Sequence, residues 1–292
     1  MGGRIAEKDN PLTVMQELYF TQFHEKVSSS KEMEKFYRKV ISASGVLDMA
    51  ERSSRPLTIV DICGGGGRLG HELEKEVKKP INIVNVDISN EQLRIDNGKL
   101  KIRGEMMHLP LADKVADVAL LINMPNPVRV VENHLERTKP DSIKEIADNY
   151  ELYCLLADAR HCTVKLAVFE GLRILKDNGI MSFGTVYRGP STYGVEKIDV
   201  PLKQVGFEIF GLDLKVAKLW DDYGISVEKP EFFVESFRKI GEVNRSSVTQ
   251  CRNALRDSLE SLSGSKRFWE VIGEMRRAEE AKKKIVGKID RE

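Results

Sequence analysis

The chain has 292 residues, a formal net charge of +1 at pH 7, 41% hydrophobic residues and 31% charged residues. This composition predicts a globular chain with one large domain or two small ones. It argues against a membrane span, which needs an apolar run of ~20 residues, and the near-zero charge argues against a nucleic-acid partner. The N-terminus has no apolar signal core, and the four cysteines form no CxxC or zinc-type spacing. We therefore expect a cytoplasmic protein with reduced thiols and no bound metal.

The first half of the chain predicts alternating helices and strands. Residues 11–50 place apolar side chains at helical spacings, and the SSRP stretch at 53–56 interrupts them. Short apolar runs follow, each bounded by polar or glycine-rich segments. The expected elements are a strand at 57–62, an amphipathic helix at 68–79, and strands at 81–87, 99–104 and 117–123. This alternation favours a parallel, doubly wound sheet.

The second half of the chain adds a long insertion. About fifty-five residues separate the fourth strand from the fifth, at 179–187, which is far more than an ordinary crossover requires. We expect a loop at 126–140. A long helix follows it, capped by Asp141 or Ser142 and ended by the DNG sequence at 177–179. The remaining expected elements are strands at 206–214 and 231–240 and a charged helix from about residue 243.

These elements predict an α/β fold with a doubly wound, mostly parallel, seven-stranded Rossmann-like sheet. The expected parts are an N-terminal helical cap at 1–54, a Rossmann-like domain at 55–242 with an insertion at about 125–160, and a C-terminal helical extension at 243–292. From Lys266 onward, basic and acidic residues alternate at helical spacing, which is typical of a solvated helix with i,i+4 pairs. A nucleic-acid contact is the alternative for this tail.

The sequence DICGGGGRLG at 61–70 places four consecutive glycines directly after the first expected strand. Because glycine loses more backbone entropy on folding than other residues, the run indicates that a ligand approaches the bare backbone. The loop precedes a helix, and this is where open α/β sheets bind their ligands. Gly65, Gly67 and Gly70 fit GxGxxG, so a dinucleotide is one candidate, whereas no GK[ST] follows as a P-loop requires. A tight turn without a ligand is the remaining interpretation.

Two carboxylates bracket the glycine run. Asp61 stands where dinucleotide sites usually have apolar residues, and it could bind a cationic amino group or brace the loop. Asp87 closes the second strand, where a carboxylate can accept both hydroxyls of a ribose. Capping of the next helix is an alternative role for Asp87, and the two roles can coexist. After the third strand, Glu105 and Met106 are expected near an adenine.

Together these residues resemble the class I S-adenosylmethionine-dependent methyltransferases, over roughly residues 55–240. The most similar branch is the small-molecule one that includes the ubiquinone and menaquinone biosynthesis methyltransferases. Asp61, Gly65 and Gly67 match the family's acidic-x-Gly-x-Gly-x-Gly motif, with Cys63 at its first glycine, and Asp87 matches the ribose-binding acid. The further matching stretches are GEMMHLP at 104–110, AVFEGLRILKDNGIMSFGTV at 167–186 with Asp177 and Asn178 in place of Pro-Gly, and GFEIFGL at 206–212.

The resemblance implies an enzyme that uses S-adenosylmethionine as methyl donor and a small molecule as acceptor. The sulfonium of the donor already makes its methyl group electrophilic, so the protein is expected mainly to align the acceptor for in-line displacement. The residues implied to contact the donor are Asp61, Cys63, Gly64, Gly65, Gly66, Gly67, Asp87, Ile88, Glu105, Met106 and Asn123.

The acceptor side has three candidate residues. Asn123 ends the fourth strand in the sequence NMPNP, which resembles the [Asn/Asp/Ser]-Pro-Pro-aromatic motif of amino-directed methyltransferases but lacks the aromatic residue. His134 lies in the insertion and could act as a general base, although a solvated loop histidine is the commoner case. Tyr187 ends the fifth strand and is a candidate by position.

Three other functions stay open on the sequence. An RNA- or protein-directed amino methyltransferase would use Asn123. A binding protein could keep the donor site without turnover, since no general base is evident. An NAD-dependent oxidoreductase is supported by GxGxxG and Asp87, but Asp61 and the 104–110 stretch oppose it.

Overall fold

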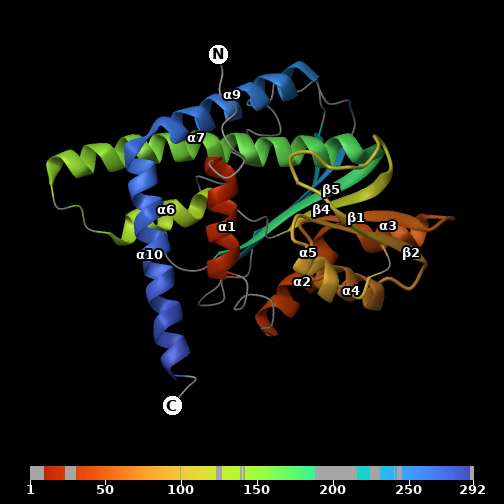
Figure 1. Cartoon of the computed structure of the whole chain (residues 1–292). Helices are drawn as coiled ribbons and strands as arrows, with labels where there is room; N and C mark the ends of the chain where they lie inside the picture. The colour runs from red at the N-terminus through yellow and green to blue at the C-terminus, as the bar shows by residue number, and fades with distance from the viewer. Residues whose placement is uncertain are drawn as a thin grey trace. The chain divides into compact units, whose positions relative to one another are not determined.

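The computed structural model of the chain describes residues 10–23, 31–98, 100–122, 127–138, 140, 142–187, 216–223, 231–239, 241 and 245–289. The chain divides into two compact units (Figure 1). The sheet unit comprises Val27–Met124 and Val164–Gln250. The helical unit comprises Met1–Lys26, Pro125–Thr163 and Cys251–Glu292.

The sheet unit is built on a seven-stranded sheet with the strand order β3-β2-β1-β4-β5-β7-β6. Neighbouring strands from β3 to β5 are parallel, whereas β7 is antiparallel to both β5 and β6. The strands are β1 (Leu57–Ile62), β2 (Ile81–Asp87), β3 (Leu100–Arg103), β4 (Ala116–Ile122), β5 (Leu175–Tyr187), β6 (Val216–Tyr223) and β7 (Glu231–Lys239). The expectation of an α/β fold with a mostly parallel, Rossmann-like sheet is therefore confirmed.

The helices are distributed over both units. Those of the sheet unit are α2 (Lys31–Ala43), α3 (Val46–Arg52), α4 (Arg68–Glu76) and α5 (Asn90–Ile95), and those of the helical unit are α1 (Pro11–Phe23), α6 (Pro127–Arg137) and α10 (Lys266–Ile289). Two helices, α7 (Ile143–Ile174) and α9 (Arg245–Gly264), contribute residues to both units. The expected cap of α7 is confirmed at Ser142, whose Oγ accepts a hydrogen bond from the Glu145 amide at 3.1 Å.

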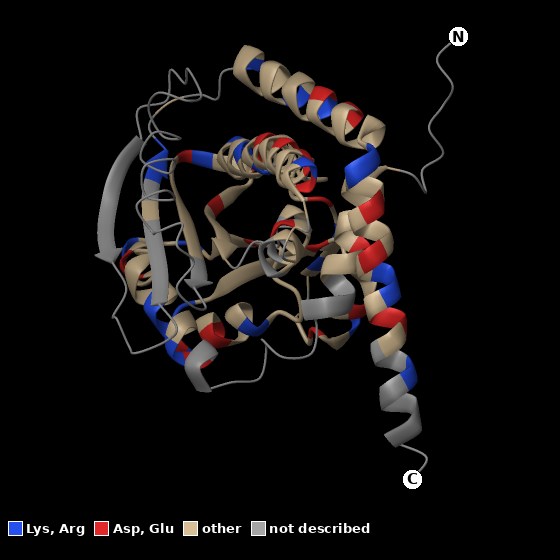
Figure 2. Ribbon diagram, turned by 90° about the vertical axis from the view of Figure 1, so that its left-hand side faces the viewer, with Lys and Arg blue, Asp and Glu red and all other residues tan. Residues whose placement is uncertain are grey.

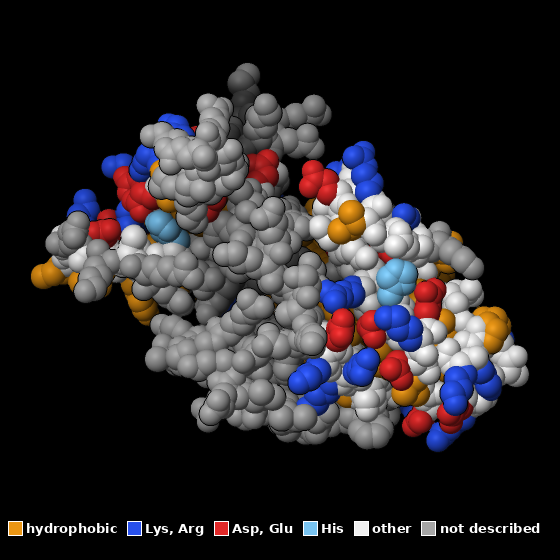
Figure 3. All heavy atoms as spheres, turned by 90° about the horizontal axis from the view of Figure 1, so that it is seen from below, with side chains coloured by type: hydrophobic (Ala, Val, Ile, Leu, Met, Phe, Trp, Pro, Cys, Tyr) orange, Lys and Arg blue, Asp and Glu red, His pale blue; other side chains and the backbone are white. Residues whose placement is uncertain are grey.

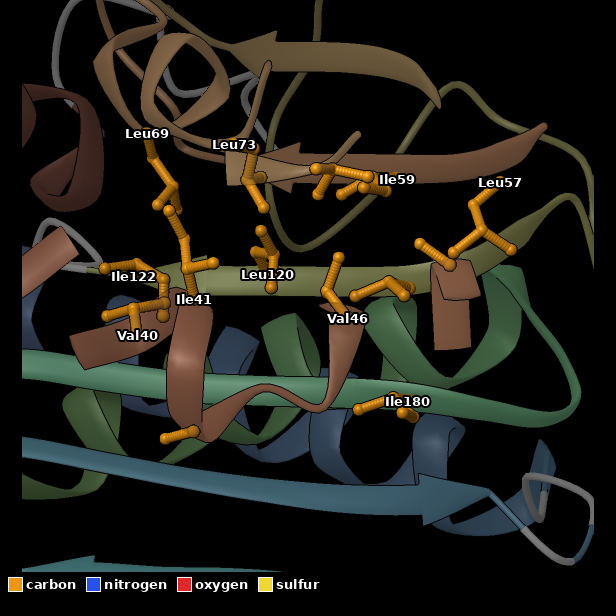
Figure 4. Packing of buried hydrophobic residues seen from close by; sticks show 14 of the residues in the cluster. Val40, Ile41, Val46, Leu57, Ile59, Leu69, Leu73, Leu120, Ile122 and Ile180 are labelled. Atoms are coloured by element: carbon orange, nitrogen blue, oxygen red, sulfur yellow. The ribbon is translucent and has the colours of Figure 1, made fainter. Parts of the chain in front are cut away.

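The core of the sheet unit lies where α2, α3 and α4 pack against β1 and β4 (Figure 4). Leu69 and Leu73 are four residues apart and so lie on one face of α4. They pack in one cluster with Ile59 of β1 and Leu120 of β4, which are 0% and 1% exposed. Burial of each such side chain contributes ~1.5–3 kcal/mol. This packing holds the carboxyl ends of β1 and β2 side by side, in the register Ile62↔Val86.

Strand β3 forms one edge of the sheet and is short. Among the described strands it pairs with β2 alone, from Val84↔Leu100 to Asp87↔Arg103, and most of its side chains are exposed. Lys101 Nζ donates a hydrogen bond to the carbonyl oxygen of Asp96 at 3.0 Å, and Arg103 Nε donates one to the carbonyl oxygen of Ile88 at 3.3 Å. The two cations therefore tie this edge strand to the turns at either end of α5.

The expected loop at 126–140 is wrong, because Pro127–Arg137 forms helix α6. Proline is favourable at the first position of a helix, where its missing N–H costs no hydrogen bond. Val128, Val131 and Leu135 recur at helical spacing and are 0%, 0% and 5% exposed. Valine lowers intrinsic helix propensity, and burial of this apolar face outweighs that preference.

The expected helix stop at the DNG sequence is also wrong. Helix α7 ends earlier, at Ile174, and β5 begins at the next residue. Pairing of β5 with β4 shifts register between Ala116↔Leu175 and Val118↔Ile180, and Asn178 within this irregularity has φ 62°. Asparagine tolerates this left-handed conformation better than most residues. The DNG sequence therefore forms a bulge within β5.

The last strands of the sheet agree in part with those predicted from the sequence. The predicted strand at 231–240 is confirmed as β7. The predicted strand at 206–214 lies outside the described residues. Strand β6, at Val216–Tyr223, was not expected.

The helical unit contains a partly buried polar network around Arg267 of α10. The Arg267 side chain is 14% exposed, and its guanidinium lies 2.8 Å from Glu145 Oε1 and donates to Asn149 Oδ1 at 2.8 Å. Along the coloured part of α10 in Figure 2, basic and acidic residues are interleaved, and Lys266 forms an i,i+4 pair with Glu270. Among the described residues, no helix is both long enough and apolar enough to cross a membrane.

Candidate functional site

The glycine run lies where the strand order of the sheet reverses. From β1 the chain continues outward through β2 to β3, and it then returns to the other side of β1 at β4. The carboxyl ends of the strands at such a reversal are where doubly wound folds bind ligands. The loop after β1 runs directly into α4, whose N-cap is Gly67.

Two of the four glycines need a conformation that other residues rarely adopt. Gly65 and Gly67 have φ values of 53° and 72°. A Cβ at Gly67 would also overlap the Asp96 carboxylate. At Gly64 a Cβ would lie 2.5 Å from Asn85 Oδ1 and 2.6 Å from Asp61 Oδ2. The side chains of Asp61, Asn85 and Asp96 therefore lie where a Cβ on Gly64 or Gly67 would be.

Asp87 fastens the loop to the end of β2. Its Oδ2 accepts a hydrogen bond from the Gly65 amide at 2.9 Å, and its Oδ1 accepts one from the Ser89 amide at 2.8 Å. Asp87 is 7% exposed. A carboxylate has about four acceptor positions, so these bonds are compatible with binding of a ribose diol.

Asn85 and Asp96 form a second attachment of the loop. Asn85 Nδ2 donates to the carbonyl oxygen of Gly65 and to Asp96 Oδ2, both at 2.8 Å. Asp96 Oδ1 accepts from the Gly98 amide at 2.6 Å. Both side chains are buried. The loop is thus joined to β2 by two separate hydrogen-bonded side chains, and through Asp96 to the end of α5.

Asp61 is the most buried carboxyl group of the site, with 1% of the residue exposed. Among the described residues, none donates a hydrogen bond to Asp61 Oδ2 or to Asn85 Oδ1. Burial, with added repulsion from Asp87 and Asp96, raises the pKa of Asp61 from 3.8 to about 8. Two buried acceptors beside one bare glycine therefore require a donor, either a proton on Asp61 or a group supplied by a ligand.

Burial also raises the pKa values of ionisable groups near Asp61. Burial raises the pKa of Tyr37 on α2 to about 12, and the Asp61 carboxylate adds to this effect. Burial also raises the pKa of the Cys63 thiol well above its usual range. Cys63 Sγ lies 3.6 Å from Met106 Sδ, and Met106 is 7% exposed. The pKa of Glu105 is raised by burial, with a partial offset from His108.

Cys63 adopts a left-handed conformation with φ 62°, which is unfavourable for a residue with a Cβ. We expect Cys63→Gly to be more stable than Cys63→Ala by about 1 kcal/mol, the reverse of the usual order, because only glycine relieves the ~1–2 kcal/mol backbone cost. Both variants lose the contact with Met106, so their difference isolates the backbone. Denaturant unfolding of the two variants measures it, and an alanine variant as stable as the glycine variant would contradict the prediction.

The expected donor-contact residues that the structure describes all belong to the sheet unit. The glycine run, Cys63, Asp61 and Asp87 meet at the carboxyl ends of β1 and β2, and Met106 reaches the same place from the segment after β3. Ile88 directly follows β2 and is partly exposed. Glu105 contributes to the electrostatic environment of Cys63.

The three candidate residues for the acceptor side differ in what the structure describes of them. Asn123 lies outside the described residues. Tyr187 ends β5, with its backbone paired to Glu231, and its side chain lies outside the described part. His134 belongs to the helical unit, where its Nε2 lies 3.2 Å from Glu274 Oε2. The histidine that could act as a base therefore contacts a glutamate of α10 within the helical unit.

Sequence reasoning missed Asn85, Gln92 and Asp96. Asn85 was assigned only to a buried strand, and Asp96 follows a short helix with no motif around it. Gln92 and Ile95 on α5 lie beside Gly65 and Gly66, where each approaches the position of a Cβ to 3.5 Å or less. The polar residue in an otherwise apolar strand, INIVNVD, was the available signal.

Residues 26–119 match the ubiE/COQ5 methyltransferase family. This range contains the whole glycine loop and the residues of β2, α5 and the segment after β3 that surround it. No curated protein matches the chain.

Solved structures that can be aligned with this chain include several methyltransferases. The PH0226 protein of Pyrococcus horikoshii is 14% identical, with 76% of this chain and 98% of that one covered and a TM-score of 0.43. An S-adenosylmethionine-dependent methyltransferase of Thermotoga maritima, described as a possible histamine N-methyltransferase, is 19% identical, with 77% and 99% covered and a TM-score of 0.38. The N-methyltransferase NodS of Bradyrhizobium japonicum is 12% identical, with 74% and 100% covered and a TM-score of 0.40.

Proposed function

We propose that this chain, a class I S-adenosylmethionine-dependent methyltransferase most similar to the ubiE/COQ5 branch, transfers a methyl group to a small-molecule acceptor. The observation that carries the proposal is the family match over the segment that builds the glycine loop. The match removes the dinucleotide interpretation that GxGxxG left open. A small-molecule acceptor is further supported by the net charge of +1 and by the interspersed basic and acidic side chains on the described part of the face in Figure 3.

The residues of the loop fit the methyl donor. Asp87 would accept the two ribose hydroxyls, and Asp61 with Asn85 would receive the amino group at the bare face of Gly64. Met106 would contact the adenine. We assign Ile88 to the other side of the adenine, Glu105 to its amino group, and Cys63 with Gly65, Gly66 and Gly67 to the backbone beside the methionine part.

When bound, the donor supplies a methyl group that its sulfonium already makes electrophilic. What remains for the protein is to hold the reacting groups in line and to exclude water, which converts a bimolecular step into an oriented one. Asp87 and the loop fix one end of this alignment. For the acceptor we retain Asn123 and Tyr187 as positioning candidates at the ends of β4 and β5, and His134 as a candidate base.

We expect Asp87→Asn to weaken binding of S-adenosylmethionine and S-adenosylhomocysteine about 10- to 100-fold, because hydrogen bonds to a charged acceptor contribute ~1.5–3 kcal/mol. Calorimetric titration measures this change. Glu91→Gln, an exposed acid on α5, is the matched control and should bind as the wild type does. Unchanged affinity in the Asp87 variant would refute its assignment to the ribose.

The acceptor class is tested by labelling a lysate with methyl-labelled donor. We expect label in the low-molecular-weight fraction with the wild type and a strong reduction with Asp87→Asn. Label in RNA or protein instead would replace the small-molecule acceptor with a macromolecular one. Donor binding with no labelled product in any fraction would contradict turnover of an acceptor in that lysate.

A further inference from the structure

We propose that Asn85 is a binding residue and Asp96 a positioning residue of the donor site. Asp96 orients the Asn85 amide so that Asn85 Oδ1 and the Asp61 carboxyl group form one paired acceptor for a cationic amino group. This inference rests on the proposed function. It assigns roles to two residues that lie outside the glycine motif and contact it from β2 and from the end of α5.

The orientation of the Asn85 amide follows from its surroundings. Its Nδ2 donates both hydrogens, one to the Gly65 carbonyl oxygen and one to Asp96 Oδ2. The flipped amide would place Oδ1 against those two oxygens, which are acceptors and would repel it. Oδ1 is therefore directed to the other side, where Asn85 Oδ1 and Asp61 Oδ2 lie 2.5 Å and 2.6 Å from the position that a Cβ on Gly64 would occupy.

Asp96 is held independently of the loop. It is the C-cap residue of α5, it is 4% exposed, and its Oδ1 accepts from the Gly98 amide. Its position is possible only because Gly67 has no Cβ. Asp96 thus fixes the Asn85 amide from a site that does not depend on a bound ligand.

Asp61 Oδ2 and Asn85 Oδ1 determine the charge of the ligand group that can bind between them. The ionisable groups around Asp61 are Asp87 of β2, Asp96 of α5, Cys63 of the loop and Tyr37 of α2, with Arg68 of α4 near Tyr37. Before a ligand binds, a proton on Asp61 satisfies both oxygens by a hydrogen bond to Asn85 Oδ1. An arriving ammonium donates to both oxygens instead, and the Asp61 carboxyl group then releases its proton to solvent. The raised pKa of Asp61, about 8, agrees with the protonated form at neutral pH.

The experiment counts protons released on binding, by calorimetry at pH 7 in buffers of different ionisation enthalpy. S-adenosylhomocysteine should release close to one proton from the wild type. 5′-Methylthioadenosine, the corresponding nucleoside without the amino-acid part, should release none. A structural role alone would not produce this difference between the two ligands.

Two variants test the roles of Asn85 and Asp96. Asp96→Asn keeps the acceptor for Gly98 and places an amide group against Asn85, and Asn85→Leu keeps the size and removes both polar groups. We expect each to weaken S-adenosylhomocysteine about tenfold while 5′-methylthioadenosine binding stays as in the wild type. Asp96→Asn should also release less than half a proton, because a repelled Asn85 amide turns its Nδ2 toward Asp61 and favours the carboxylate before binding. Glu91→Gln is the control for the loss of an acid on α5.

The outcomes separate this inference from the proposed function. If the wild type binds neither nucleoside, the donor-site assignment itself fails. If it binds both, and the variants keep the wild-type affinity ratio and proton release, only the roles of Asn85 and Asp96 are refuted. Preserved binding of 5′-methylthioadenosine shows that a variant has folded.

Discussion

Asp61→Asn should raise the free energy of unfolding at pH 8 by up to about 6 kcal/mol, at ~1.4 kcal/mol for each pH unit between the ordinary and the raised pKa of Asp61. It should at the same time weaken S-adenosylhomocysteine binding about tenfold. Asparagine keeps the shape of the carboxyl group, and its Nδ2 can donate to the unpaired Asn85 Oδ1. The stability gain arises because the variant buries no ionisable group. The affinity loss arises because an amide cannot balance the charge of an ammonium group.

The raised pKa of Asp61 determines how the free energy of unfolding changes with pH. The pKa of Asp61 is about 8 in the folded chain, against an ordinary value of 3.8, so between these values the folded state binds a proton that the unfolded state has released. Wild-type stability should therefore fall as pH rises from about 4 to about 8, by up to ~1.4 kcal/mol per pH unit from this group. Above pH 8 the contribution is constant, and Asp61→Asn lacks it throughout.

Denaturant unfolding of wild type and variant across this pH range measures the difference, which cancels the contributions of other groups. The free energies should be nearly equal near pH 4 and should diverge toward pH 8. A difference that does not change with pH would mean that Asp61 is ionised in the folded protein. Binding of 5′-methylthioadenosine serves as the control for an intact site.

Gly67→Ala should destabilise the sheet unit by about 3–5 kcal/mol, because it combines a left-handed backbone with an overlap on the Asp96 carboxylate. Gly65→Ala is the matched control. Gly65 has a similar φ, 53°, but a Cβ there meets only Gln92 Oε1 at 3.5 Å, an ordinary contact. Its cost should be the backbone term of ~1–2 kcal/mol.

Thermal and denaturant unfolding of the two glycine variants separate these effects. The excess cost at position 67 is the part due to Asp96. Equal destabilisation at both positions would mean that Asp96 moves aside without cost, and it would weaken the view that this carboxylate is rigidly held.

Sequence patterns were sufficient where one local preference dominates. The apolar runs that become β1 and β4 are buried on both sides in a parallel sheet, as is the second half of β2, so composition alone identifies these strands. The glycine run was also sufficient to locate the loop, because the left-handed backbone at Gly65 and Gly67 excludes most other residues.

The errors arose where packing outweighs local preference. The segment that forms α6 contains valines and a proline, which suggested a loop, yet its apolar face is buried in the helical unit. At Asn178 the DNG sequence resembles a helix stop, and strand pairing to β4 turns it into a bulge. Tertiary pairing of this kind leaves no signature in a short stretch of sequence.

Only some residues of the donor site could be predicted from the sequence. The sequence places Asp61 and Asp87 near the carboxyl ends of two predicted strands. Because the carboxyl ends of neighbouring parallel strands meet, these two acids could be predicted to lie in one site. The Asn85–Asp96 pair was not predictable, because eleven positions separate these residues and the turn after α5 brings them together.

The short edge strand β3 has a consequence for association between copies of the chain. An unpaired strand edge is a template for adding a strand from another molecule, and natural sheets protect such edges with positive charge. Lys101 and Arg103 occupy this edge and are held at the backbone of Asp96 and Ile88. Two cations on a four-residue strand make stacking of one copy's β3 on another's electrostatically unfavourable, so this edge is protected against growth of the sheet into an aggregate.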